Sequence, residues 1–397
     1  MVRVLALLSV VLAVVTACGG SAKQGTTEDP DSAGHVIADA PADKLDQSLR
    51  DAASSARTMT YASRNGVNDA VSHVTGSVFV PKGAPPPGGF PIVALGHRNT
   101  GTASDCAPSL SPDLLGEAAT VVALLDAGYV VTVPDYQGLG KPSKPDEYDF
   151  HPYLDSTTSG FTMIDAVRAT RNLVPNTSTS WAAVGAQEGG QAAWAANELA
   201  DNYGNDLKLV AAAALAPMAE FTGLADAAMA GTLNTDQKLI YVAYLAALKN
   251  EYYYDFELDD YRRGAAEQNW DALLNCGDAA HRRALAEQIA PADLRPANPA
   301  ALQTLRGYLQ KTNLPQGPTQ APMYVIYGGQ DPVIPAAWTD QAIANACQMG
   351  DVIQIAFWPD KGRDQIEPVA ALGWLTDRMK SLPSANDCPS FTAGHKP

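Results

Sequence analysis

Short apolar runs alternate with segments of helical periodicity along most of this chain. Seven runs of β-branched and apolar residues are bounded by turn residues, at 74–80, 91–96, 129–134, 181–184, 207–216, 323–327 and 352–357. Helical periodicity fills most of the intervals between them, at 114–127, 160–173, 191–199, 338–349 and 368–379. Strands that alternate with helices form βαβ units. We therefore predict an α/β fold with a mostly parallel, doubly wound sheet.

The alternation stops at about residue 221 and resumes at about residue 320. The segment between is rich in Ala, Leu and Tyr, and its periodicity predicts helices over 238–249, 255–268 and 280–289. An insertion before the last two strands lies over the carboxyl edge of the sheet, where open α/β folds bind ligands. We predict a core formed by 45–220 and 321–388, a helical cap over 221–320 and a tail over 389–397.

The strand predicted at 181–184 runs directly into GAQEGG at 185–190, and a predicted helix follows. A strand, a glycine-rich turn and a helix in this order form the nucleophile elbow G-x-S-x-G of α/β-hydrolases. The centre of this turn is Gln187 instead of serine.

The chain resembles the secretory lipase family from about residue 45 to 380. The elbow reads GAQEGGQAA where that family typically has GHSQGGQAA. The other matching blocks are HRNTG at 97–101, CAPS at 106–109, DYQGLG at 135–140, HPYL at 151–154 and DAVRA at 165–169. The resemblance implies an α/β-hydrolase fold with a helical cap, and lipase or carboxylic ester hydrolase chemistry.

The resemblance places Asp331, in YGGQDPVIP at 327–335, at the position of the triad acid. The alternative is a turn residue before Pro332. The catalytic histidine belongs about 30 residues later, after the last strand, where this chain has Arg363. His395 follows Asp331 in the sequence, but it lies in the tail and is a poor substitute.

These replacements remove two of the three triad roles. The amide of Gln187 has no hydroxyl to deprotonate, so it cannot form the acyl intermediate of covalent catalysis. Arg363 keeps its proton and cannot shuttle one. We expect Asp331 and Arg363 to form a closed polar cluster with side chains less than about 5 Å apart, and Gln187 to hydrogen-bond beside them.

The oxyanion-hole region also departs from the family. The hole pairs the backbone N–H that follows the nucleophile, here of Glu188, with a donor from the loop of His97, Arg98 and Asn99. Arg98 replaces a family glycine, which puts a long cation in the expected path of a substrate carbonyl. The carboxylate of Glu188 is expected to be stabilised by the dipole of the helix that it begins.

The N-terminus has the features of an export signal. Arg3 precedes an apolar run at 4–15 that is too short to span a bilayer, so we predict a signal peptide over 1–17. The VTAC sequence at 15–18 resembles a bacterial lipobox and implies lipid modification of Cys18, with an ordinary cleaved signal as the alternative. Residues 18–44 contain few large apolar side chains and are predicted to form a flexible tether. The expected location is the outer face of the cell membrane.

Charge and cysteine content limit the partners and cofactors. A net charge of −16 argues against nucleic acid. Four cysteines remain after Cys18, which favours two disulfides, with three possible connectivities. The family resemblance favours two pairs, Cys106–Cys276 and Cys347–Cys388. No metal-binding or phosphate-loop motif is present, so we expect no metal and no cofactor.

Two functions are open, and a third, that of a wall-attachment or transport component, has no sequence feature of its own beyond the lipid anchor. The first is an inactive hydrolase relative that binds an acyl or lipid ligand, or a partner, beneath the cap. The second is an active lipase with an unconventional site, using water activated by Asp331 or Glu188, or a serine such as Ser159. An open apolar tunnel beneath the cap would favour lipid binding.

Overall fold

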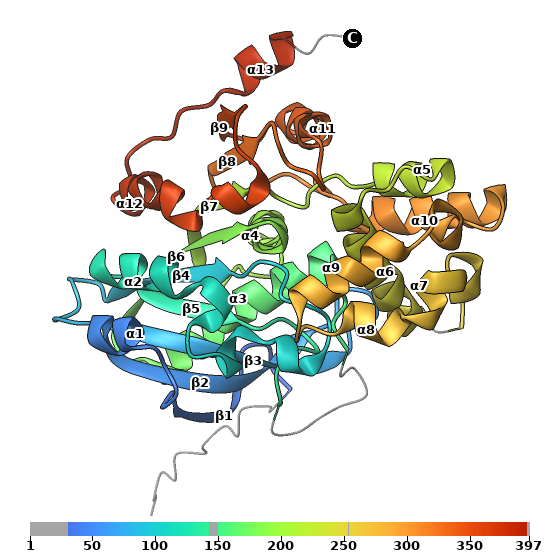
Figure 1. Cartoon of the computed structure of the whole chain (residues 1–397). Helices are drawn as coiled ribbons and strands as arrows, with labels where there is room; N and C mark the ends of the chain where they lie inside the picture. The colour runs from blue at the N-terminus through green and yellow to red at the C-terminus, as the bar shows by residue number, and fades with distance from the viewer. Residues whose placement is uncertain (1–30, 143–149, 253, 395–397) are drawn as a thin grey trace, which may run out of the picture.

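The computed structural model describes residues 31–142, 150–252 and 254–394. Nine strands form one sheet in the order β1-β2-β3-β5-β4-β6-β7-β8-β9 (Figure 1). The strands are β1 (Val36–Pro41), β2 (Ala53–Arg64), β3 (Val71–Pro81), β4 (Phe90–Gly96), β5 (Val130–Pro134), β6 (Thr177–Ala186), β7 (Lys208–Leu215), β8 (Met323–Gly328) and β9 (Ile353–Trp358). Pairing is antiparallel from β1 to β5 and parallel from β5 to β9, so the predicted α/β fold is confirmed.

Helices cover both faces of the sheet, which explains why its central strands are apolar on both sides. One face packs against α3 (Ser156–Leu173), α4 (Glu188–Leu199) and α11 (Ala336–Gln348). The other face packs against α1 (Gln47–Ala52), α2 (Ala118–Asp126) and α12 (Leu372–Met379). Short 3-10 helices lie at Ser104–Cys106, Pro108–Leu110, Leu114–Gly116, Leu258–Asp260, Pro291–Leu294, Arg363–Gln365 and Pro368–Ala371.

The predicted insertion is helical and lies at one side of the sheet, drawn from yellow-green to orange in Figure 1. Its helices are α5 (Gly223–Ala230), α6 (Thr235–Glu251), α7 (Gly264–Gln268), α8 (Trp270–Leu274), α9 (Ala279–Gln288) and α10 (Pro299–Thr312). The insertion, called the cap below, has a hydrophobic core of its own that includes Tyr241, Leu245 and Phe256. Val333 and Ile334, which follow β8, join that core and connect the cap to the sheet.

Both expected disulfides are present. Cys106 pairs with Cys276 and joins the loop after β4 to the cap, and Cys347 pairs with Cys388. The second bond fixes α13 (Cys388–Gly394), a short helix that begins at the last residue of the predicted core and continues into the predicted tail.

The structure corrects two predictions from the sequence. Residues 36–41 lie in the predicted tether, but they form β1 and pair with β2, so the sheet begins before residue 45. Residues 255–268 are not one helix, since only the 3-10 turn Leu258–Asp260 and α7 are helical there. The predicted signal peptide, Cys18 and His395 lie outside the described residues. Within the described part of the chain, no helix combines the length and apolar composition that crossing a membrane requires.

Candidate functional site

The turn between β6 and α4 has the geometry of a nucleophile elbow. Gln187 occupies its tip with φ 58° and ψ −114°, a conformation that a non-glycine residue rarely adopts. Gly189 allows the turn to approach β4, because a Cβ atom there would lie 2.0 Å from the carbonyl oxygen of Gly96. The strained backbone of the elbow is therefore retained although the serine is absent.

The side chain of Gln187 is hydrogen-bonded to Asp364, its Nε2 donating to Oδ1 at 2.8 Å. Asp364 lies in the 3-10 turn after β9, next to Arg363. The expected neighbours of Gln187 were Asp331 and Arg363, so the structure places this amide in the predicted region but gives it a different partner. An amide held in this way blocks the tip of the elbow with a group that cannot act as a nucleophile.

Asp331 and Arg363 meet as expected, but the contact is not a direct hydrogen bond. Arg363 Nη1 lies 3.7 Å from Asp331 Oδ1, and both side chains are buried. The same Oδ1 accepts hydrogen bonds from the backbone N–H groups of Val333 and Ile334, at 2.8 and 3.0 Å. Asp331 therefore also has the turn role that the sequence left open. Arg363 Nη2 contacts Met218 Sδ at 3.2 Å.

Arg98 does not enter the expected path of a substrate carbonyl. Its guanidinium forms ion pairs with Glu117, at 3.6 Å, and with Glu367. Burial raises the pKa of Glu117, and the charge of Arg98 opposes that rise. The arginine therefore compensates a buried carboxyl, and it is not among the residues that line the cavity above Gln187.

Glu188 and His151 form a buried pair that sequence reasoning missed. His151 Nε2 lies 2.9 Å from Glu188 Oε1, and each side chain is 1% exposed. His151 Nδ1 lies 3.0 Å from the carbonyl oxygen of Gln137. The carboxylate of Glu188 is therefore not stabilised by the helix dipole alone, as the sequence led us to expect, because it also contacts His151. The histidine belongs to the HPYL block at 151–154, but nothing in the sequence places that block beside Glu188.

The other two residues of the predicted oxyanion loop make local contacts. The ring nitrogens of His97, which is fully buried, contact the carbonyl oxygens of Arg98 and Asp135 at 2.6 and 3.1 Å. The Nδ2 of Asn99 donates to the Tyr153 hydroxyl at 2.5 Å. Of these two side chains, only that of Asn99 lines the cavity above Gln187.

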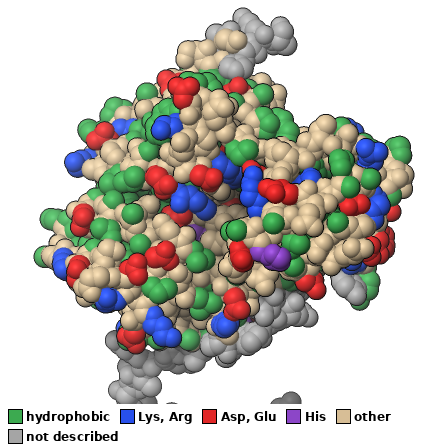
Figure 2. Space-filling model, in the orientation of Figure 1, with side chains coloured by type: hydrophobic (Ala, Val, Ile, Leu, Met, Phe, Trp, Pro, Cys, Tyr) green, Lys and Arg blue, Asp and Glu red, His purple; other side chains and the backbone are tan. Residues whose placement is uncertain are grey.

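That cavity lies between the cap and the core and has a volume of about 420 Å³. Figure 2 shows charged side chains of both signs gathered along the boundary between these two parts. The cavity is lined by charged, polar and apolar side chains together, namely Asn99, Gln187, Asp236, Leu239, Ile240, Arg282, Arg283, Pro332, Val333, Arg363 and Asp364. It is therefore a mixed pocket with one apolar side, and it differs from the apolar tunnel that would favour a purely lipid ligand.

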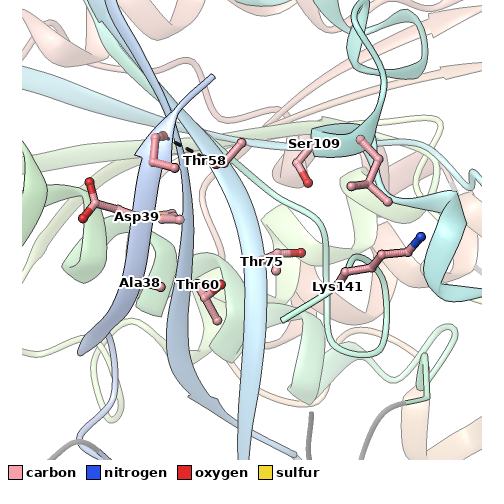
Figure 3. Close-up of a pocket in the computed structure, with 10 residues that line it drawn as sticks. Ala38, Asp39, Thr58, Thr60, Thr75, Ser109 and Lys141 are labelled. Carbon is pink, nitrogen blue, oxygen red and sulfur yellow. Dashed lines mark hydrogen bonds between the residues drawn. The ribbon is translucent and has the colours of Figure 1, made fainter. Parts of the chain in front are cut away.

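A second cavity of about 250 Å³ lies beside β1, β2 and β3 (Figure 3). The hydroxyls of Thr75 and Ser109 face it, and both donate to the buried Asp135. Lys141 at its rim pairs with Asp105. The side chains of Thr75, Ser109 and Lys141 are thus engaged with residues outside this cavity, which lies on the antiparallel part of the sheet, away from the elbow.

The residues considered for an unconventional active site are not arranged for one. Ser159 is 3% exposed within α3, Glu188 is held by His151, and neither lines the cavity above Gln187. Among the described residues, no group of three or more His, Cys, Asp or Glu side chains is placed to hold a metal ion.

The sequence does not identify most of the residues that line this cavity, and Asp364 and Arg282 are two of them. Asp364 directly follows Arg363, and the sequence does not indicate which of these two side chains contacts Gln187. Arg282 carries no local signal, because it is one of several charged residues in the helix predicted at 280–289. Only the packing of the cap onto the core brings it to this cavity.

Comparison with solved structures supports the fold. Candida antarctica lipase A in its closed state superposes with a TM-score of 0.72 at 17% identity, over 89% of this chain and 84% of the lipase. A ligand-bound form of the rice cell wall degrading esterase LipA from Xanthomonas oryzae superposes with a TM-score of 0.67 at 20% identity, over 88% of this chain and 96% of the esterase. At these identities the likeness shows the α/β-hydrolase fold alone.

Sequence comparison shows the family. No curated protein sequence matches this chain. The family model described as secretory lipase matches residues 113–387, a span that includes the elbow, the cap and the positions of the triad acid and histidine. The chain therefore belongs to the secretory lipase family.

Proposed function

We propose that this protein is a secretory lipase relative that has lost ester hydrolysis and binds an acyl-containing ligand in the cavity between cap and core. The observation that carries the proposal is the hydrogen bond from Gln187 to Asp364 at the tip of the elbow. The amide at this position has no hydroxyl to deprotonate, and the lone pair of its nitrogen is delocalised and not free for attack. The cap and a cavity of about 420 Å³ are nevertheless retained, within the size range of ligand pockets.

The acid–base part of the reaction is missing as well. Arg363 keeps its proton at any physiological pH, so it cannot accept one from a nucleophile or donate one to a leaving group. Oδ1 of Asp331 already accepts hydrogen bonds from two backbone N–H groups, which makes this carboxylate a poor base for activating water. The alternative of an active lipase with an unconventional site has no arrangement of side chains in this cavity to support it.

The test is hydrolysis of p-nitrophenyl esters with acyl chains of increasing length. The protein is the chain from residue 19 to 397, which keeps every described element, compared with the double variant Gln187→Ser, Arg363→His. We expect no turnover by the natural chain and measurable turnover by the double variant, because the elbow backbone and Asp331 are already in place. Loss of triad residues costs about 10⁶ in rate in a serine hydrolase, so the assay has a wide range.

The single variant Gln187→Ser is the matched control, since it restores the hydroxyl without a base. We expect this single variant to show almost no ester turnover. Turnover by the natural chain, with labelling by a fluorophosphonate, would show that a nucleophile exists elsewhere and would contradict the proposal.

We further propose that the protein is exported and held at the outer face of the cell membrane by lipid on Cys18. The support is the lipobox-like sequence at 15–18 and the membership of a secretory family. A lipid-modified cysteine carrying more than one acyl chain anchors stably. Radiolabelled palmitate should enter the natural chain and not the Cys18→Ser variant, which should leave the membrane fraction. Equal membrane retention of both forms would exclude this anchor.

A further inference from the structure

Two arginines face the cavity above Gln187 from opposite sides, Arg363 from the core and Arg282 from cap helix α9. Arg363 is 5% exposed, and its Nη1 is buried without a hydrogen-bond acceptor. Its nearest carboxylate partner is Asp331, at 3.7 Å, which is beyond hydrogen-bond distance. A buried guanidinium with an unsatisfied N–H group is costly, and an anion at this point would satisfy it.

Arg282 is also incompletely paired. Its Nε is buried without an acceptor, and within the described residues it takes part in no ion pair. Burial lowers the pKa of its guanidinium, with no carboxylate acting against that effect. Its neighbour Arg283 is different, because it forms ion pairs with Asp236 and Glu287.

The acidic side chains around the cavity are already engaged. Asp236 holds Arg283, and Asp364 accepts from Gln187. The start of α4, a helix of 12 residues, reaches the same cavity at Gln187 and adds the positive end of its dipole. The unsatisfied groups are therefore donors and positive charges, which is the complement of an anion.

The rest of the lining determines which anion fits. Leu239 and Ile240 of α6 and Val333 after β8 give the cavity an apolar side. Asp236 and Asp364 line it as well, so a dianion such as a phosphate monoester meets more repulsion than a monoanion does. A planar carboxylate matches the donor geometry of guanidinium groups, and an alkyl chain matches the apolar side.

We propose that this cavity binds the free carboxylate of an aliphatic acid, with the head group between Arg282 and Arg363 and the alkyl chain against Leu239, Ile240 and Val333. The inference rests on the proposed function and narrows its ligand from acyl compounds in general to the ionised acid. An ester of the same chain length carries no charge and leaves both guanidiniums unsatisfied.

The test is isothermal titration calorimetry of residues 19–397 with octanoate, 1-octanol and inorganic phosphate. We expect octanoate to bind at least about tenfold more tightly than octanol, the equivalent of about 1.4 kcal/mol. Arg282→Gln should weaken octanoate binding by tenfold or more and leave octanol unchanged. Arg306→Gln is the matched control, because it removes the same charge from an arginine of α10 that pairs with Asp226 outside the cavity, and it should change neither ligand.

Several results would overturn the proposal. They are equal affinity for octanoate and octanol, undiminished octanoate binding by Arg282→Gln, binding of phosphate in place of octanoate, or binding of none of the three. Each of these is independent of the ester assay. If the natural chain neither binds octanoate nor hydrolyses esters, the carboxylate site is ruled out and the proposed loss of catalysis stands. If the natural chain hydrolyses esters, the proposed loss of catalysis is ruled out.

Discussion

The imidazole of His151 lies between two hydrogen-bond acceptors, the carboxylate of Glu188 at 2.9 Å and the carbonyl oxygen of Gln137 at 3.0 Å. A neutral ring has only one N–H, so both contacts are satisfied when the ring is protonated or when the proton lies on Glu188. Glu188 is the first residue of α4, immediately after the tip of the elbow. The buried pair thus fastens the start of that helix to the segment at residue 151.

Replacement of Glu188 by alanine should therefore destabilise the fold strongly. The change leaves His151 buried without its partner, and loss of one member of a buried pair typically costs about 3–5 kcal/mol. Urea unfolding followed by tryptophan fluorescence measures the loss. Glu188→Gln should recover most of it, because the amide can donate to the neutral ring. The exposed Glu287→Ala is the control, with an expected change within about 0.5 kcal/mol. Equal midpoints for Glu188→Ala and this control would show that the pair adds nothing.

The stability of the protein should fall as the pH rises, in part through Glu251. Burial, reinforced by the charge of Asp155, raises the pKa of Glu251 from 4.5 to about 8. Between these values the folded protein holds a proton that the unfolded chain releases, so the contribution of this group to the free energy of unfolding decreases by about 1.4 kcal/mol per pH unit. The stabilisation is complete below pH 4.5 and is lost as the pH passes through 8.

Glu251→Gln should remove this slope, because an amide does not titrate and still accepts the hydrogen bond that Asn65 donates to Oε1 of Glu251. The measurement is the free energy of unfolding of both proteins at pH 5, 7 and 9. The difference between them isolates Glu251 from Glu198, whose pKa burial also raises to about 8. A variant with the same pH dependence as the natural chain would rule out this role.

The two disulfides should differ in their contribution to stability. The Cys106–Cys276 bond closes a segment with a sequence separation of 170, against 41 for Cys347–Cys388. Chain entropy predicts that replacing the first pair by serines costs about 1.3 kcal/mol more than replacing the second. Thermal unfolding of the two double variants measures the difference. Limited proteolysis should also cut the first variant sooner between α8 and α9. The reverse order of melting temperatures would contradict the prediction.

Arg98 should matter for stability and not for ligand binding. The variant Arg98→Ala removes the positive charge that compensates the carboxylate of Glu117, which is 2% exposed. We expect the free energy of unfolding to fall by about 2 kcal/mol at pH 7. Because its side chain does not line the cavity, octanoate affinity should remain within twofold. A large drop in that affinity would place Arg98 in the binding site after all. Glu367→Gln, on the exposed side of the same cluster, should be nearly neutral.

The features that the sequence predicted correctly depend on patterns over many residues. Alternating strands and helices, the glycine-rich turn at 185–190 and an even number of cysteines each constrain the fold strongly, and the structure contains all three. The seven predicted runs do not include β1 or the 12-residue β2. β1, with the sequence VIADAP, is a short edge strand that pairs on one side only. Such a strand gains its stability from backbone pairing with β2, which local composition does not reveal.

Side-chain partners were harder to predict than positions. The meeting of Asp331 and Arg363 followed from the chain order of the triad, because both positions converge on the elbow in this fold. Gln187 bonds to Asp364 and not to the adjacent Arg363 because of how the 3-10 turn after β9 orients these two side chains. Sequence composition does not predict this orientation. The position of Arg282 depends on how the cap packs against the core, and this tertiary contact has no local sequence signal.

The attachment of the cap has a mechanical consequence. The cap leaves the sheet after β7 and returns to it at β8, and Cys276 fastens it a third time, to the loop after β4. Attachment at three separate points restricts rotation of the cap about any one of them. We therefore expect the opening above Gln187 to keep nearly the same size in the free and the ligand-bound protein, so that it selects ligands by their dimensions.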